Sequence, residues 1–366
     1  MTDPRVEKMA RVIADYSLAL APGQLVLLTG EPAGYPLLRA VYELAIRAGA
    51  HPEVKTLYPE LDEIRLREGN DAQLLFLSEA ALFEAGKIDA RLYVRAPDNV
   101  RTAAGVDPAR QVLVSRGRKP LLDRYMERRV RGELASCLTQ YPTDGLAQLA
   151  GMSLAEYEQF VFRACFVDRD DPVGAWRELS RRQQRYVDRL DRARELRFEA
   201  PDTDLTVSVA GRKWINSDGK ANFPSGEVFT SPVEESARGI IRFDMPALFH
   251  GQSVEGILLE FRDGVVVSSR AERGGEFLER MLGTDQGASR LGEVAFGLNY
   301  GITRATGSIL FDEKIGGTIH LALGACYPQT GGSNQSAIHW DMIRSMTPGR
   351  VFADGEVIYE DGRFRE

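Results

Sequence analysis

The stretches QLVLLTG (24–30), PLLRAVYELAIRAGA (36–50) and PEVKTLY (52–58) decide the fold class of the N-terminal half. A short apolar run, a longer run with helical spacing and a second β-rich run follow one another. The alternation continues with ARLYVRAP (90–97) and LASCLT (134–139). Strands that alternate with helices in this way are typical of parallel sheets covered by helices. We therefore expect an α/β fold that begins with an open, largely parallel sheet.

Gly30 and Gly34 follow the first of these strands, but they do not form a phosphate-binding motif. Their spacing matches neither the G-x-G-x-x-G pattern of dinucleotide-binding folds nor a Walker loop. We therefore expect a tight turn between strand and helix, and no nucleotide.

The C-terminal half has a different texture, with short β-like runs after Pro201. Its turns SDGK (217–220), RDGV (262–265), ADGE (353–356) and EDGR (360–363) each contain Asp-Gly, a frequent β-hairpin signal. One helical insert, ERGGEFLERMLG (272–283), interrupts the strands, and a charged helical pattern that ends near Arg197 precedes them. We expect two domains, an α/β domain over residues 1–198 and a β-rich catalytic domain with helical inserts over residues 199–366.

The bulk composition is that of a soluble globular protein, with 43% hydrophobic and 27% charged residues in 366. A net charge of -7 argues against general nucleic-acid binding. There is no apolar run of membrane-spanning length and no signal-peptide pattern, so we expect a cytoplasmic protein with neither membrane nor nucleic-acid partners. Cys137, Cys165 and Cys326 are too widely spaced for a disulfide framework or a zinc knuckle. A metal site would therefore use oxygen and imidazole ligands.

Two of the four histidines lie in apolar runs of the C-terminal half, close in sequence to carboxylates. In SAIHWDMI (336–343), strand geometry would place His339 and Asp341 on one face. An isolated pair of this kind is more often a tethered histidine than a metal site. However, Glu227, Glu293 and His320 also lie in apolar or glycine-rich surroundings, with Glu313 in reserve. A carboxylate is costly there unless it is paired or binds a metal. This ligand set exceeds the needs of one ion and suits two ions bridged by a carboxylate.

Four motifs together resemble the signature series of the aminopeptidase T family of dinuclear metallo-aminopeptidases. They are FPSGEVFTSP (223–232), LGEVAFGLN (291–299), DEKIGGTIHLALG (312–324) and SAIHWDMI (336–343). The resemblance implies the metal ligands Glu227, Glu293, His320, His339 and Asp341. It also implies that the phenols of Tyr300 and Tyr327 lie near the metals, where they could hydrogen-bond a developing oxyanion. The interval between His320 and His339 is shorter than in the better-known members, which indicates a shorter branch.

The resemblance implies a metalloprotease that releases N-terminal amino acids from peptides with a free N-terminus. Two divalent ions (zinc, cobalt or manganese) would activate a water molecule, and either Glu293 or Glu313 would carry the proton. The family pairs its subunits, so we expect a homodimer.

Two alternatives remain open at this point. A mononuclear non-heme iron dioxygenase that cleaves dihydroxypyridine rings uses the same scaffold and needs two histidines and one carboxylate. His320, His339 and Asp341 would suffice for it, but Glu227 and Glu293 would then be unexplained. The other alternative is a non-catalytic module that binds metal or peptide.

Overall fold

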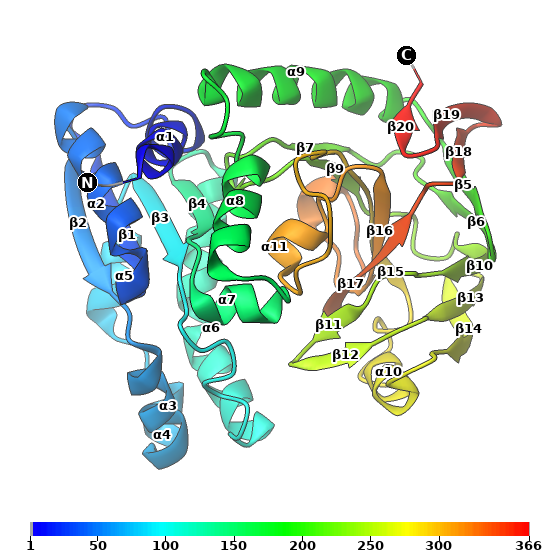
Figure 1. Ribbon diagram of the computed structural model, residues 1–366. Coiled ribbons are helices and arrows are strands. Elements are labelled where there is room, and N and C mark those ends of the chain that lie inside the picture. Colours follow the sequence, from blue (N-terminus) through cyan, green and yellow to red (C-terminus); the bar gives the residue numbers. More distant parts are fainter. Residues whose placement is uncertain (1–2, 366) are drawn as a thin grey trace. The chain divides into compact units, whose positions relative to one another are not determined.

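Residues 3–365 are described by a computed structural model, in which the chain forms two units with different sheets (Figure 1). The first unit contains the described residues up to Ala175 together with Gly219–Pro224. The second contains Trp176–Asp218 and the described residues from Ser225 onward. The expected α/β fold class, with a parallel N-terminal sheet and a β-rich C-terminal half, is confirmed. The domain limit between residues 198 and 199 stays a prediction.

The first unit is built on a parallel sheet, as the alternation of strands and helices predicts. Its strands in spatial order are β2 (His51–Thr56), β1 (Leu25–Gly30), β3 (Ala90–Arg95), β4 (Ala135–Gln140) and β8 (Asn222–Phe223). Its helices are α1 (Pro4–Val12), α2 (Tyr35–Arg47), α3 (Pro59–Glu68), α4 (Asp71–Leu75), α5 (Glu79–Ala85), α6 (Pro108–Val130), α7 (Asp144–Leu149) and α8 (Leu154–Ala164). A π-helical turn at Ile13–Ser17 and a 3-10 turn at Pro32–Gly34 complete it.

The turn after β1 is tight because its glycines lie directly against β3. A Cβ atom on Gly30 would lie 2.8 Å from the carbonyl oxygen of Val94, and one on Gly34 would lie 2.9 Å from a Val94 methyl group. These glycines therefore serve close packing of the turn, as expected.

The second unit contains two antiparallel sheets. The larger sheet has the order β14 (Val265–Arg270), β13 (Leu258–Arg262), β10 (Arg238–Arg242), β6 (Thr203–Ser208), β5 (Glu195–Ala200), β18 (Arg350–Ala353), β19 (Glu356–Glu360) and β20 (Arg363–Phe364). The smaller sheet has the order β17 (His339–Ser345), β16 (Thr318–Gly324), β15 (Leu291–Gly297), β9 (Glu227–Thr230) and β7 (Ile215–Ser217). A separate hairpin is formed by β11 (Ala247–Phe249) and β12 (Gln252–Val254). The helix α9 (Pro172–Leu190) begins in the first unit and continues into the second, which also contains α10 (Gly275–Leu282), α11 (Ile309–Asp312) and a 3-10 turn at Pro328–Thr330.

Two local predictions for this region were wrong. The charged helix does not reach Arg197, because α9 ends at Leu190 and the segment Glu195–Ala200 forms β5. Leu196 and Phe198, two residues apart, are both buried in the core. This alternation is the pattern of a strand, and it decides the structure here over the charge pattern that suggested a helix. The turn SDGK does not close a hairpin either, since β7 and β8 belong to different sheets. The other three Asp-Gly turns each connect antiparallel neighbours, with positive φ at both residues.

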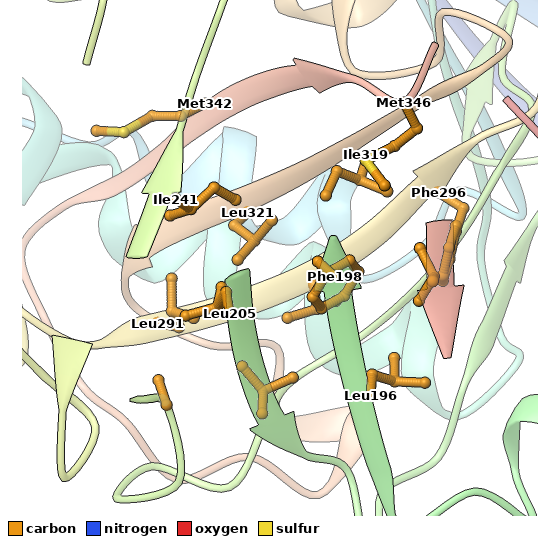
Figure 2. Close-up of a cluster of buried hydrophobic side chains, with 14 of the residues drawn as sticks. Leu196, Phe198, Leu205, Ile241, Leu291, Phe296, Ile319, Leu321, Met342 and Met346 are labelled. Atoms are coloured by element: carbon orange, nitrogen blue, oxygen red, sulfur yellow. The ribbon is translucent and has the colours of Figure 1, made fainter. Parts of the chain in front are cut away.

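The core of the second unit lies between its two main sheets (Figure 2). Leu196 and Phe198 of the larger sheet gather there with Phe296, Ile319 and Leu321 of the smaller sheet. Every residue of β15 and β16 is buried, so the opposite face of these strands is covered as well. Side chains on that opposite face are therefore buried without belonging to the apolar core.

No helix within residues 3–365 is both long enough and apolar enough to cross a membrane.

Candidate metal centre

The candidate ligands lie on the face of the smaller sheet that points away from the apolar core. In β16, Ile319 and Leu321 enter the core, so His320 between them points to the opposite face. In β17, Trp340 enters the core, and His339 and Asp341 share the opposite face as expected. The alternation of strand side chains thus separates structural residues from candidate ligands.

A β-bulge in β15 is required to bring Glu293 to this face. Simple alternation would place Leu291 and Glu293 on the same side, yet Leu291 is part of the core. The register shifts between these two residues, at Gly292. A Cβ atom on Gly292 would lie 2.3 Å from the Ala325 carbonyl oxygen, so a glycine fits this close approach.

Small residues occupy the positions between the ligands on neighbouring strands. Ala322 is paired in register with Glu293 on one side and with Asp341 on the other. His320 lies opposite Ala295, His339 opposite Gly324, and Glu227 opposite Gly297. Adjacent side chains in a sheet have Cβ atoms about 5 Å apart. Alanine and glycine at these positions therefore leave space next to each of the five candidate ligands on the strands.

The ligand atoms form two groups, each with its atoms within 4.8 Å of one another. One group is Glu227, Glu313 and His320, and the other is Glu293, His339 and Asp341. Glu293 connects them, because its Oε1 lies 3.7 Å from His320 Nε2 and its Oε2 lies 3.1 Å from His339 Nε2. The two oxygens of one carboxylate thus point to the two groups.

The chemistry of this cluster fits divalent cations. Glu227 Oε2, Asp341 Oδ1 and both ring nitrogens of His320 are buried and have no hydrogen-bond partner among the described residues. A buried polar atom without a partner is costly, and a bound cation would remove that cost. The donors are carboxylate oxygen and imidazole nitrogen without sulfur, which suits ions such as zinc, cobalt or manganese.

The carboxylates also produce a strongly negative environment for the two imidazoles. Burial lowers the pKa of His320, but the proximity of Glu293 and Glu227 outweighs it and raises this pKa to about 9. Burial also lowers the pKa of His339, but the charge of Asp341 outweighs it and raises this pKa to about 12. An environment that stabilises positive charge on two histidines would equally stabilise bound cations.

The carboxylates themselves fall into two kinds. Burial raises the pKa of Glu293 and of Asp341, yet the neighbouring histidines lower both below their ordinary values. Burial raises the pKa of Glu313 to about 8, although the positive charge of Lys314 acts to lower it. Of these three carboxylates, Glu313 is the one that most readily holds a proton.

The orientation of His339 is set by a backbone contact. Its Nδ1 lies 2.7 Å from the carbonyl oxygen of Ala325, which makes Nδ1 the protonated nitrogen that donates. Nε2 is then left facing Glu293 and Asp341. A donor contact of this kind on the far nitrogen is typical of metal-ligating histidines.

Of the two tyrosines expected near the metals, Tyr327 lies beside a candidate ligand and Tyr300 contacts other residues. The ring of Tyr327 lies 5.0 Å from the imidazole of His339, and burial together with the site carboxylates raises the pKa of its phenol. Tyr300 is not in this cluster. Its phenol donates a hydrogen bond to the Gly362 carbonyl oxygen at 2.7 Å, and its ring lies beneath Arg363.

Sequence reasoning missed one charged group of the cluster, the side chain of Lys314. It is 0% exposed, and its Nζ lies 3.4 Å from Glu227 Oε1 and also contacts Glu313 Oε1. Burial lowers the pKa of Lys314, but the charges of Glu227 and Glu313 raise it above its ordinary value. In the sequence, Lys314 follows two acidic residues in the run DEKIGG and precedes a glycine turn. This pattern is typical of a solvent-exposed loop, so no local signal indicates a buried lysine.

The chain is similar to a known protein family and to several of its members. A family model described as thermophilic metalloprotease (M29) matches residues 2–364. Aminopeptidase 2 of Geobacillus stearothermophilus is 30% identical over 93% of this chain and 92% of its own length. Aminopeptidase T of Thermus thermophilus is 30% identical over 98% of this chain and 95% of its own length.

Two solved structures resemble this chain over nearly its whole length. The structure of wild-type AmpT from Thermus thermophilus has a TM-score of 0.87 and 27% identity, with 99% of each chain covered. The structure of 2,5-dihydroxypyridine dioxygenase from Pseudomonas putida KT2440 has a TM-score of 0.58 and 14% identity over 98% of this chain and 96% of that one. At this identity the second similarity concerns the fold alone.

Proposed function

Because the chain belongs to the thermophilic metalloprotease family, we propose that its metal centre releases N-terminal amino acids from peptides by means of two divalent ions. The resemblance seen in the sequence is confirmed, and the chain is a metal-dependent aminopeptidase. Its substrates are therefore peptides. The number and kind of ions, the ligand set and the role of each residue are the parts that we propose.

The position of Glu293 is the observation that carries the proposal of two ions. Its two oxygens face the two groups of ligand atoms, one toward His320 and the other toward His339. We propose that Glu227 and His320 hold one ion, that His339 and Asp341 hold the other, and that Glu293 bridges them. When bound, two such ions lower the pKa of a water molecule and polarise the scissile carbonyl group.

The remaining residues of the cluster would handle the proton and the oxyanion. Both oxygens of Glu293 are directed to ligand groups, so we assign proton transfer to Glu313, which lies beside Glu227 and His320. The phenol of Tyr327 would donate to the oxyanion that develops on the substrate. Tyr300 receives no support for this role, since its phenol is engaged by the Gly362 carbonyl.

The free α-amine of the substrate would provide the exopeptidase specificity. It would bind one of the ions or a single nearby carboxylate and so orient the substrate, whereas an N-acetylated terminus has neither the charge nor the ability to ligate a metal. We therefore expect cleavage to be restricted to the unblocked terminus.

The test is the release of amino acids from one peptide in unblocked and N-acetylated form, under anaerobic conditions. We expect cleavage of the unblocked peptide only, loss of activity with chelator, and recovery with zinc, cobalt or manganese. Equal cleavage of both peptides would indicate an endopeptidase. Cleavage of neither, together with oxygen uptake on a dihydroxypyridine in a separate aerobic assay, would support the dioxygenase. That alternative is not favoured, because its single iron would leave the group around Glu227 and Glu313 without a use.

We also propose that the protein is a homodimer. Closed two-fold pairing is the commonest assembly of soluble proteins, and α6 carries an exposed apolar stripe of Leu122, Met126 and Val130 at four-residue spacing. Light scattering at micromolar concentration tests this, and a monomer mass would refute it. The cytoplasmic location stays a prediction from the sequence.

A further inference from the structure

Lys314 is a buried ammonium group placed between two carboxylates of the metal centre. Its side chain is 0% exposed, and its Nζ contacts Glu227 Oε1 at 3.4 Å and Glu313 Oε1. Burial of an ammonium group is costly unless opposite charges surround it. A lysine that served only to fill this space could be replaced by an apolar side chain of similar length at no such cost.

Backbone hydrogen bonds hold the segment that carries Lys314 in place. The Lys314 N–H donates to the Phe311 carbonyl at 3.0 Å, and the Lys314 carbonyl accepts from the Asn299 N–H at 3.0 Å. The side-chain amide of Asn299 donates to the Ser225 carbonyl at 2.8 Å, two residues before Glu227. Asn299 therefore ties the segment of the lysine to the segment of the ligand that the lysine contacts.

The two oxygens of Glu227 have different surroundings as a result. Oε1 faces the Lys314 ammonium group, whereas Oε2 has no hydrogen-bond partner among residues 3–365 and lies 3.5 Å from His320 Nε2. Only Oε2 is thus free to bind an ion. Glu313 is likewise engaged by the ammonium group through one oxygen.

We infer that Lys314 is a positioning residue that leaves Glu227 and Glu313 one free oxygen each, so that neither carboxylate can hold an ion through both of its oxygens. This inference rests on the proposed dinuclear function. With Glu313 held by the ammonium group, its second oxygen stays available to carry a proton. The lysine would thereby limit the number of oxygens that these two carboxylates offer to one ion.

The charge of Lys314 has a second consequence, which allows a sharp test. A positive charge next to the ligands opposes the binding of cations, and this repulsion is strong inside a protein. Removing the charge should therefore make the protein bind its ions more tightly while it works more slowly. A purely structural role predicts the reverse, because a deformed site would lose ion affinity.

The experiment compares the wild type with Lys314→Met and Lys314→Gln, which remove the charge, and with Lys314→Arg, which retains it. Arg344→Met is the matched control, because Arg344 is a buried cation that pairs with Asp244 and the Pro201 carbonyl outside the cluster. Zinc affinity is measured by competition with a coloured chelator at neutral pH. The visible absorption of the cobalt-loaded proteins reports the coordination number, since additional ligand oxygens weaken it. Circular dichroism of the metal-free proteins checks the fold.

We expect the neutral variants to bind zinc about tenfold more tightly than the wild type, with weaker cobalt absorption and lower kcat. Lys314→Arg and Arg344→Met should keep the wild-type affinity. Equal or weaker zinc binding by a folded neutral variant would overturn the inference. Peptidase activity of the wild type is measured first, and its absence would refute the proposed function. The zinc affinities would still decide the role of Lys314.

Discussion

Two neighbouring residues of β16 offer a test of the two-faced sheet on which the metal centre depends. Leu321 is 0% exposed and points into the apolar core, whereas Ala322 lies in register between Glu293 and Asp341 on the opposite face. We expect Leu321→Ala to reduce the free energy of unfolding without affecting the metal centre. We expect Ala322→Val to disrupt the metal centre at a similar or smaller cost in stability.

The magnitudes follow from these positions. Leu321→Ala removes a fully buried side chain and should cost about 3 kcal/mol of unfolding free energy. Ala322→Val adds two methyl groups at a buried position, and overpacking of this kind costs about 1–3 kcal/mol. The added methyl groups enter the space between two carboxylates whose Cβ atoms lie about 5 Å from that of residue 322. Displacement of a reacting group by about 1 Å can reduce activity about 100-fold, so we expect Ala322→Val to lose at least that much kcat/KM.

The assay separates stability from metal binding. Unfolding by urea in the presence of chelator compares the two variants without metal, and metal content is measured after loading with zinc and dialysis. Activity is expressed per folded molecule. If Ala322→Val kept both ions and near wild-type activity, or if folded Leu321→Ala lost an ion, the assignment of the two faces would be refuted.

Three further predictions concern other groups. His339→Ala and Asp341→Ala should each abolish peptidase activity and lose an ion while the protein stays folded, and near wild-type turnover with two ions in either variant would show that the pair is structural. Glu313→Gln should reduce kcat about 100-fold or more while both ions remain bound, and unchanged turnover would move the proton-carrying role to Glu293. The pKa of Asp285 lies below its ordinary 3.8, mainly because the Ala337 N–H donates to its carboxylate. Its stabilising contribution is therefore complete above pH 3.8 and is lost as the pH falls through the lowered pKa. The difference in unfolding free energy between chelator-treated wild type and Asp285→Asn should shrink on acidification, and a difference independent of pH would contradict this origin.

Much of the fold was predictable because its signals are local. The alternation of apolar runs with helical spacing correctly indicated β1, α2 and β2, and three of the four Asp-Gly turns close hairpins. The failures lie where tertiary burial overrides a local pattern. The charged pattern that extends to Arg197 is typical of a helix, but Leu196 and Phe198 are buried in the core of the second unit as part of β5.

The sequence by itself determined which side chains could bind metal, because residue type and the period-two spacing of His339 and Asp341 are local properties. Only the tertiary structure decided which of these side chains meet. The bulge at Gly292 turns Glu293 away from the core, and strand order places it between His320 and His339. The burial of Lys314 against Glu227 depends on the same through-space arrangement. Contacts of this kind join segments far apart in the chain, and their register follows from the packing of whole strands, which no short stretch of sequence encodes.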